Sequence, residues 1–274
     1  TRAGWFLGLT LLILLVASSI NQFTRRLAAP GSLYTFVVRG LGPLAGLVAA
    51  GALAVGYLFV SLSSAVGATS YLARSIGFAV PSLQTRLPQL EPYIAVALML
   101  GVGILLLIGV RRATVVMLVI EVIAIGTVVT ALVIAAVVGL GRLPGSVAAS
   151  ASAWTLDAPP SALVAATVIA LSAFIGFESS SALGAEAQRP MRTLPRVITW
   201  TAVGVGVLFT FGTLVQSTAF AGLGLAPSAN PVDDILAGLG LTGMLPAFDI
   251  AVMASFLACA TASMMALVRL ILAL

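Results

Sequence analysis

The chain has 274 residues, of which 61% are hydrophobic and only 8% are charged, and its mean hydropathy is +1.19. Soluble domains carry about 25% charged residues, so this composition excludes a soluble globular protein and indicates an integral membrane protein. The net charge is +5 and every cation is arginine. Because most arginines flank apolar runs, we attribute the charge to membrane-protein loops and expect no nucleic-acid binding. With no histidine and one cysteine, we expect neither a metal site nor a cofactor.

Runs of about 20 apolar residues predict membrane-spanning helices. Seven are expected, at approximately 4–22, 42–66, 93–110, 113–139, 162–185, 197–221 and 246–270. Nine arginines fall on one side of these spans and four on the other, which makes the first side cytoplasmic. Thr1 is then outside and Leu274 inside. Since the first residue is not Met and no signal-peptide pattern precedes the first run, we expect a stretch of a longer protein.

Two of the connecting segments resemble each other. "RRLAAPGSLYTFVVRGLGP" joins the first two spans, and "GLGLAPSANPVDDILAGLGLTG" joins the last two. Each contains a proline turn, a short amphipathic piece and a Gly-Leu-Gly, and the two lie on opposite sides of the membrane. The pattern favours an inverted repeat, a feature of many secondary transporters.

The fifth predicted span contains residues that a continuous helix in hydrocarbon would avoid. "LSAFIGFESSS" places Gly176, Glu178 and three serines from mid-membrane inward. Glycine weakens a helix and serine can start one, so we predict a break at 174–178, with freed carbonyls suited to an ammonium group. The alternative is a continuous helix in which Gly176 permits close packing and Glu178 is a paired structural carboxylate. Ionisable residues within membranes are usually functional, which favours the break.

A family resemblance rests on three segments. "FIGFESSSALGAEAQRPMRTLPRVI" resembles the sixth span and following loop of the amino acid–polyamine–organocation permeases, with the pattern F-x-G-F-E…E-x-x-x-P-x-R-x-x-P. "RLAAPGSLYTFVVRGLGPLAG" resembles the family's loop between spans two and three, and "SFLACATASMMALVRLILAL" its eighth span. The resemblance covers essentially the whole chain and equates the seven predicted spans with family spans two to eight.

The resemblance implies an all-α membrane protein, a multi-span helical bundle with a partial five-plus-five inverted-repeat transporter fold and a broken fifth span. Residues 1–274 would form one transmembrane permease domain that lacks the family's first helix and the helices beyond the eighth. It also implies an integral protein of a bacterial plasma membrane.

The resemblance also assigns residues to the site. The backbone of the break would receive the substrate's ammonium, together with a strip on the second span; these residues are Ser172, Ala173, Phe174, Ile175, Gly176, Gly56, Tyr57 and Ser61. Glu178 and Phe177 would act in gating or coupling, and either Phe174 or Phe177 would close over the substrate. For Tyr57, plain packing with a satisfied hydroxyl stands as the alternative.

Two further groups of charged residues have open interpretations. Glu121 lies about 13 Å inward from Arg112 along its helix. It would serve either as a proton site or as a structural acid with a polar partner. Some proton-coupled relatives use a lysine in this span, and this chain has no lysine. Glu186, Arg189 and Arg192 would form either a cytoplasmic salt-bridge gate or a solvated positive loop.

We therefore expect a secondary active transporter that moves amino acids or related amines by alternating access. Its partners would be the small-molecule substrate, the lipid bilayer and a coupling proton or ion, and a homodimer stays open. No nucleophile–base pair or phosphate loop is present, so we do not expect an enzyme. The alternatives are a seven-helix receptor, which requires a continuous fifth helix, and a non-transporting membrane module.

Overall fold

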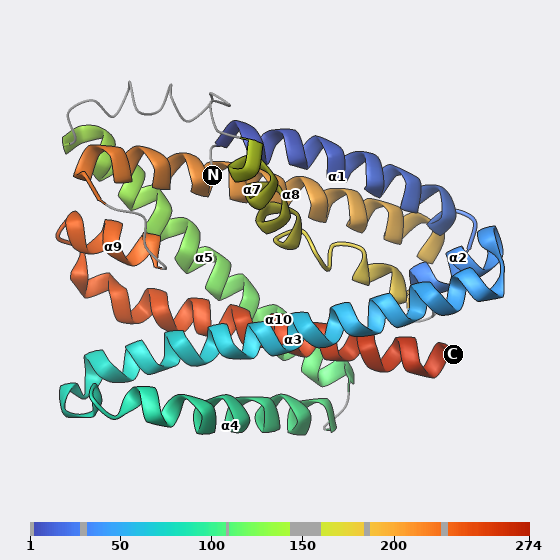
Figure 1. Ribbon diagram of the computed structural model, residues 1–274, viewed down its shortest axis with the longest axis horizontal. Coiled ribbons are helices and arrows are strands. Elements are labelled where there is room, and N and C mark those ends of the chain that lie inside the picture. Colours follow the sequence, from blue (N-terminus) through green and yellow to red (C-terminus); the bar gives the residue numbers. More distant parts are fainter. Residues whose placement is uncertain (1–2, 28–31, 108–109, 143–159, 184–186, 226–229) are drawn as a thin grey trace. The chain divides into compact units, whose positions relative to one another are not determined.

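The computed structural model describes residues 3–27, 32–107, 110–142, 160–183, 187–225 and 230–274 (Figure 1). The regular elements in these ranges are all helices: α1 (Ala3–Thr24), α2 (Ser32–Leu41), α3 (Pro43–Ala79), η1 (Pro81–Leu83), α4 (Leu87–Leu107), α5 (Val110–Arg142), α7 (Pro160–Ser172), η2 (Ser179–Leu183), α8 (Pro190–Leu223), α9 (Pro231–Gly238), η3 (Thr242–Met244) and α10 (Leu245–Ala273). Six of them, α1, α3, α4, α5, α8 and α10, are long and apolar enough to cross a bilayer. The prediction of an all-α, multi-span membrane protein is confirmed.

Six of the seven predicted spans are continuous helices, but their ends differ from the prediction. The second span was expected to end near residue 66, whereas α3 continues for 37 residues to Ala79. The polar residues after position 66 do not end α3, because a helix can continue through them. It ends before Pro81, the first residue of the 3-10 turn η1, because proline cannot continue the helical hydrogen bonds. The remaining one, the fifth predicted span at 162–185, is divided: α7 ends at Ser172, and η2 begins only at Ser179.

The chain divides into two compact units. Unit 1 comprises residues 1–49, 134–239 and 273–274, and unit 2 comprises residues 50–133 and 240–272. Unit 1 therefore holds α1, α2, α7, η2, α8 and α9. Most of α3 and α5 lies in unit 2, together with η1, α4, η3 and nearly all of α10.

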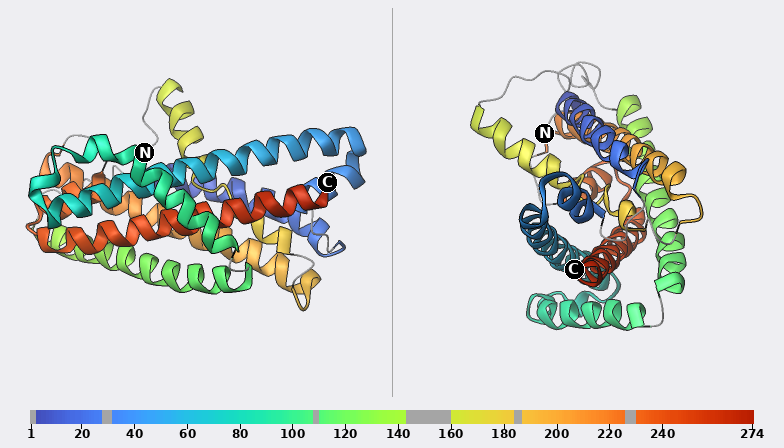
Figure 2. Two further views of the ribbon diagram at one scale, coloured as in Figure 1. Left: turned by 90° about the horizontal axis from the view of Figure 1, so that it is seen from below. Right: turned by 90° about the vertical axis from the view of Figure 1, so that its right-hand side faces the viewer.

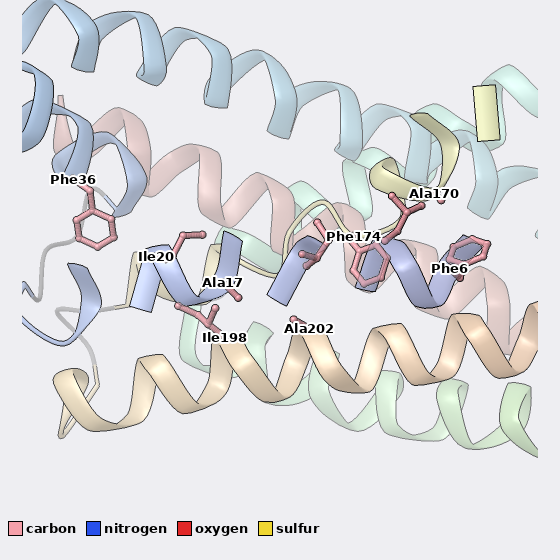
Figure 3. Packing of buried hydrophobic residues seen from close by; sticks show 10 residues of the cluster. Phe6, Ala17, Ile20, Phe36, Ala170, Phe174, Ile198 and Ala202 are labelled. Carbon is pink, nitrogen blue, oxygen red and sulfur yellow. The ribbon is translucent and has the colours of Figure 1, made fainter. Parts of the chain in front are cut away.

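The core of unit 1 is the antiparallel pair α1 and α8 (Figure 3). Its members come mainly from these two helices and from the segment after α7: Phe6, Leu9, Ile13, Ala17, Ile20, Phe36, Ala170, Phe174, Ile198 and Ala202. Lipid tails are as apolar as these side chains, so helix association in a bilayer depends on close packing. Gly206 provides it, because a Cβ there would collide with the side chain of Thr10.

In unit 2, α3 and α10 lie side by side, also antiparallel (Figure 2). The Ser61 hydroxyl donates to the Ala260 carbonyl at 3.3 Å. Toward the other end of the pair, the Arg74 guanidinium donates to the Asp249 carboxylate at 2.8 Å. Between these contacts, a Cβ on Gly67 would lie 2.8 Å from the ring of Phe256, so glycine allows the ring to approach the backbone.

The helix order repeats. The series α1, α2, α3 and the series α8, α9, α10 both run long, short, long. The short helices α2 and α9 occupy the two connections whose sequences resemble each other. The corresponding long helices pack antiparallel in both cases, α1 with α8 and α3 with α10. The inverted repeat itself stays a prediction.

Candidate functional site

The predicted break lies in the segment 173–178, a series of turns between α7 and η2. Gly176 has φ of +104°, a backbone conformation that residues with a side chain rarely adopt. Successive amides bond three residues back: Phe174 N to Leu171 O at 3.0 Å and Ile175 N to Ser172 O at 3.2 Å. The helix thus tightens into 3-10 turns, and the chain then passes through the positive-φ conformation of Gly176.

Glu178 is buried, with 8% of its surface exposed. Its carboxylate accepts a hydrogen bond from the Gly176 amide at 3.0 Å, and so satisfies a donor that the break releases. Glu178 therefore makes a structural contact, as expected if it were a paired structural carboxylate. The helix around it is nevertheless broken, whereas that alternative required a continuous helix.

The serines after the break donate hydrogen bonds to backbone carbonyls and do not cap a helix. The Ser179 hydroxyl donates to Gly176 O at 2.7 Å, and the Ser181 hydroxyl donates to Glu178 O at 2.6 Å. An N-cap serine would accept from amides. Because η2 is a 3-10 turn of five residues, the free carbonyls of the turn lie within reach of the hydroxyls, and the serines satisfy these carbonyls.

Two carbonyls in the break stay open. Among the described residues, no hydrogen bond reaches the backbone oxygen of Ala173 or of Ile175. The hydroxyl of Ser180 is buried and also lacks a partner within the described part of the chain. Backbone carbonyls at membrane depth require protein, water or a ligand. The break therefore presents acceptors, which suit a cation or a hydrogen-bond donor.

A cavity of about 290 Å³ adjoins the break. Glu178 is the charged residue in its lining. The others are apolar and come from α1, α2, the end of α7 and the break: Ile13, Val16, Ile20, Leu33, Leu171, Phe174, Ile175 and Phe177. Phe174 is 2% exposed and packs edge-on against Phe209 of α8, with ring centroids 5.8 Å apart. Phe177 is only partly buried. Of the two aromatic residues, Phe177 is the freer to move.

The other predicted substrate residues, Gly56, Tyr57 and Ser61, lie on α3 in unit 2. Tyr57 is 6% exposed, and Ser61 is fully buried with its hydroxyl bonded to Ala260 O. Ser61 thus has a structural partner on α10. Its role and those of Gly56 and Tyr57 in substrate binding stay predictions.

Glu121 lies on α5, also in unit 2, and one of its carboxylate oxygens accepts from the Ser255 hydroxyl of α10 at 2.9 Å. The other oxygen is buried and has no partner among the residues the structure describes. The geometry provides the polar neighbour of a structural acid and also leaves one oxygen open for a proton or cation.

The predicted cytoplasmic gate falls partly outside the described residues, since Glu186 does. Arg189 precedes α8 and Arg192 lies in its first turn, and both are exposed. Their side chains make no ion pair or hydrogen bond within the described ranges. The gate stays a prediction, and the two described arginines match the solvated-loop alternative.

Sequence reasoning missed two polar contacts between helices. Asp249 is fully buried and pairs with Arg74, and Asn21, 7% exposed, donates its side-chain amide to Thr199 on α8 at 2.8 Å. The available signal was an isolated polar residue inside an apolar run, which indicates a partner on another helix. The sequence does not say which partner.

Comparison with known proteins adds to this geometry. The model of a family described as "Amino acid permease" matches residues 3–272, nearly the whole chain. The chain belongs to the amino acid permease family. The expected resemblance to the amino acid–polyamine–organocation permeases is thereby confirmed, and a permease family agrees with the expectation of a non-enzymatic protein.

Two curated relatives of this permease-family chain are the low-affinity putrescine importers PlaP of Escherichia coli K12 and of Escherichia coli O157:H7. Each is 28% identical over 202 residues, which is 73% of this chain and 42% of the relative. The aligned part of the chain thus spans about two fifths of the length of these relatives.

Proposed function

We propose that this chain is part of a secondary transporter that moves an amino acid or a related amine across the membrane by alternating access. The observation that carries the proposal is the pair of open carbonyls, Ala173 and Ile175, in the same turn segment as buried Glu178. Family membership and a relative named as a putrescine importer support the substrate class.

The chemistry of the break fits an ammonium group. A primary ammonium carries three N–H donors and no acceptor, so it complements carbonyl oxygens and a carboxylate. Apolar side chains line the rest of the adjoining cavity and suit the carbon chain of an amine or amino acid. Substrate binding would involve the backbone of 172–176.

The remaining predicted residues have secondary roles in this proposal. Phe177 lines the cavity and would close over the substrate, while Glu178 would link substrate binding to closure of the gate. Glu121, with one open oxygen, is the candidate for a coupling proton or ion. Gly56, Tyr57 and Ser61 would contribute from α3, and Glu186, Arg189 and Arg192 would line the cytoplasmic entrance.

The membrane setting is also part of the proposal. The arginine distribution supports a cytoplasmic Leu274 and an external Thr1 in a bacterial plasma membrane. Symport or exchange and a homodimer both stay open. The receptor alternative requires a continuous fifth helix, and the turn segment after Ser172 argues against it.

The test is uptake by the full-length protein in liposomes. A radiolabelled panel of amino acids and putrescine would be offered with and without a proton gradient, to wild type and to Glu178→Gln. We expect saturable uptake by wild type and a loss of at least about tenfold in kcat/KM for Glu178→Gln, because a neutral amide attracts an ammonium far less than a carboxylate does. The effect of the gradient identifies proton coupling.

Asp234→Asn is the matched control. It makes the same acid-to-amide change within unit 1, on α9 and outside the cavity lining, and should transport like wild type. If folded wild type neither takes up nor exchanges any member of the panel, the transport proposal is wrong. If Glu178→Gln transports normally, Glu178 has only its structural role.

A further inference from the structure

A second cavity, of about 240 Å³, lies in unit 2 where α3 turns into α4. It is lined by Ser70, Ala73, Arg74, Gly77, Phe78, Gln84, Leu87, Pro88 and Glu91. Gly77 shapes it: a Cβ there would lie 3.3 Å from side-chain atoms of both Gln84 and Leu87. Glycine lets the start of α4 approach α3, and the Gln84 side-chain amide donates to the Gly77 carbonyl across this contact at 3.3 Å.

The charges in the lining do not cancel. The positive charge of Arg74 is met by the buried carboxylate of Asp249 at 2.8 Å, and the guanidinium also lies over the Tyr71 ring, 4.3 Å from its centroid. Glu91, by contrast, makes no hydrogen bond or ion pair with any residue that the structure describes. With Arg74 compensated by Asp249, the cavity retains the one negative charge of Glu91.

The neutral polar groups in the lining offer acceptors. The Ser70 hydroxyl donates its proton to Val66 O at 3.2 Å, so its oxygen is left as an acceptor. Gln84 donates to Gly77 O through its side-chain nitrogen, and its side-chain oxygen remains available. Together with the Glu91 carboxylate these groups give three acceptor positions, the number of donors on a primary ammonium.

The rest of the lining selects between cations. A calcium ion requires six to eight oxygen ligands, and the cavity offers one carboxylate. Ala73, Phe78, Leu87 and Pro88 are apolar and would instead contact carbon. The lining thus matches a primary alkylammonium more closely than a metal ion.

We propose that the α3–α4 cavity is a second binding site, for a primary ammonium ion held by Glu91. The site lies outside the break, on the outer side in the proposed orientation, where it would collect amine before transport. As a collecting site it rests on the proposed function. The same ammonium chemistry occurs in a free amine and in the headgroup of phosphatidylethanolamine.

The experiment measures putrescine uptake by the full-length protein in two kinds of liposome, one of phosphatidylcholine alone and one with phosphatidylethanolamine added. Glu91→Gln is compared with wild type and with Gln89→Lys. The control changes the local charge by the same +1, at an exposed position two residues away that is not part of the lining. We expect Glu91→Gln to raise KM about three- to tenfold with kcat unchanged, the size of a partly exposed charged contact.

A KM increase in both lipids identifies the free amine as the occupant. An effect of Glu91→Gln that appears only with phosphatidylethanolamine identifies the headgroup. Unchanged kinetics in both lipids, or the same change in Gln89→Lys, overturns the site. Equilibrium dialysis of radiolabelled putrescine against the purified full-length protein in phosphatidylcholine nanodiscs separates the two proposals: Glu91→Gln should lose one bound amine and Glu178→Gln the other. If Glu178→Gln loses none but Glu91→Gln does, the break proposal fails and this one stands.

Discussion

The two antiparallel helix pairs are held together in different ways. In unit 1, α1 and α8 meet through an apolar cluster, with Asn21–Thr199 as the side-chain hydrogen bond between them among the described residues. In unit 2, α3 and α10 are joined by directional contacts: an ion pair at one end and a hydroxyl–carbonyl bond further along. Corresponding positions in the repeated helix order thus have different interfaces.

The difference bears on which pair can adjust. Apolar contacts are non-directional, so small shifts exchange one contact for another. A buried ion pair fixes the register of its helices, because a shift would separate charges in a low dielectric. We infer that α3 and α10 hold one register, while α1 and α8, which pack beside the break, can tolerate small rearrangements.

The largest expected effect is at the ion pair. Asp249→Asn leaves the Arg74 guanidinium without its carboxylate partner, and removing one member of a buried pair costs about 3–5 kcal/mol. Because the Arg74 side chain is 25% exposed, water can solvate part of its unpaired charge. We therefore expect the free energy of unfolding to fall by about 2–4 kcal/mol, measured as a lower Tm of the full-length protein in detergent.

The double variant Asp249→Asn with Arg74→Gln sharpens this test. It replaces the ion pair by two neutral amides and should recover part of the lost stability. If the two substitutions are instead additive, the ion pair does not fix the α3–α10 register.

The next effect concerns close approach in unit 1. In Gly206→Ala the new methyl group meets the Thr10 side chain, whose hydroxyl is bonded to Phe6 O at 2.7 Å and therefore does not turn away freely. Overpacking of this kind costs about 1–3 kcal/mol. Gly204→Ala is the matched control, since a Cβ there meets nothing within 4 Å. Equal Tm values for the two variants would show that α1 and α8 separate at no cost.

The smallest effect is at the hydrogen bond in unit 1. A double-mutant cycle of Asn21→Leu and Thr199→Val should give a coupling energy near 0.6 kcal/mol, the average for such bonds between membrane helices. The cycle uses unfolding free energies of the full-length protein. A coupling of several kcal/mol would make the unit 1 interface as directional as that of unit 2, and the proposed contrast would be lost.

Local signals in the sequence predicted the parts of the fold that depend on neighbouring residues. Gly176 followed by Glu178 and serines predicted the break, since a glycine with positive φ and the groups that satisfy the freed backbone lie within a few residues of one another. Hydropathy located six continuous spans, because a run of apolar residues is also a property of neighbouring residues.

Contacts between residues that are distant in the sequence could not be predicted from such local signals. Nothing near Arg74 in the sequence reveals its partner Asp249, which lies 175 residues away. Ser61 was placed on a substrate-facing strip, and only the packed helices show its bond to Ala260. Assigning a polar residue to substrate or to structure requires knowing what the fold places opposite it.

The length of α3 has a consequence for the surrounding lipid. Its 37 residues extend about 55 Å at 1.5 Å per residue, whereas the hydrocarbon core of a bilayer is about 30 Å thick. The helix must therefore lean strongly or project into the headgroup layer, where the guanidinium of Arg74 and the phenol of Tyr71 are well accommodated. Thickening the bilayer would favour a more upright α3, and because α10 is tied to it through Asp249, both helices would change tilt together.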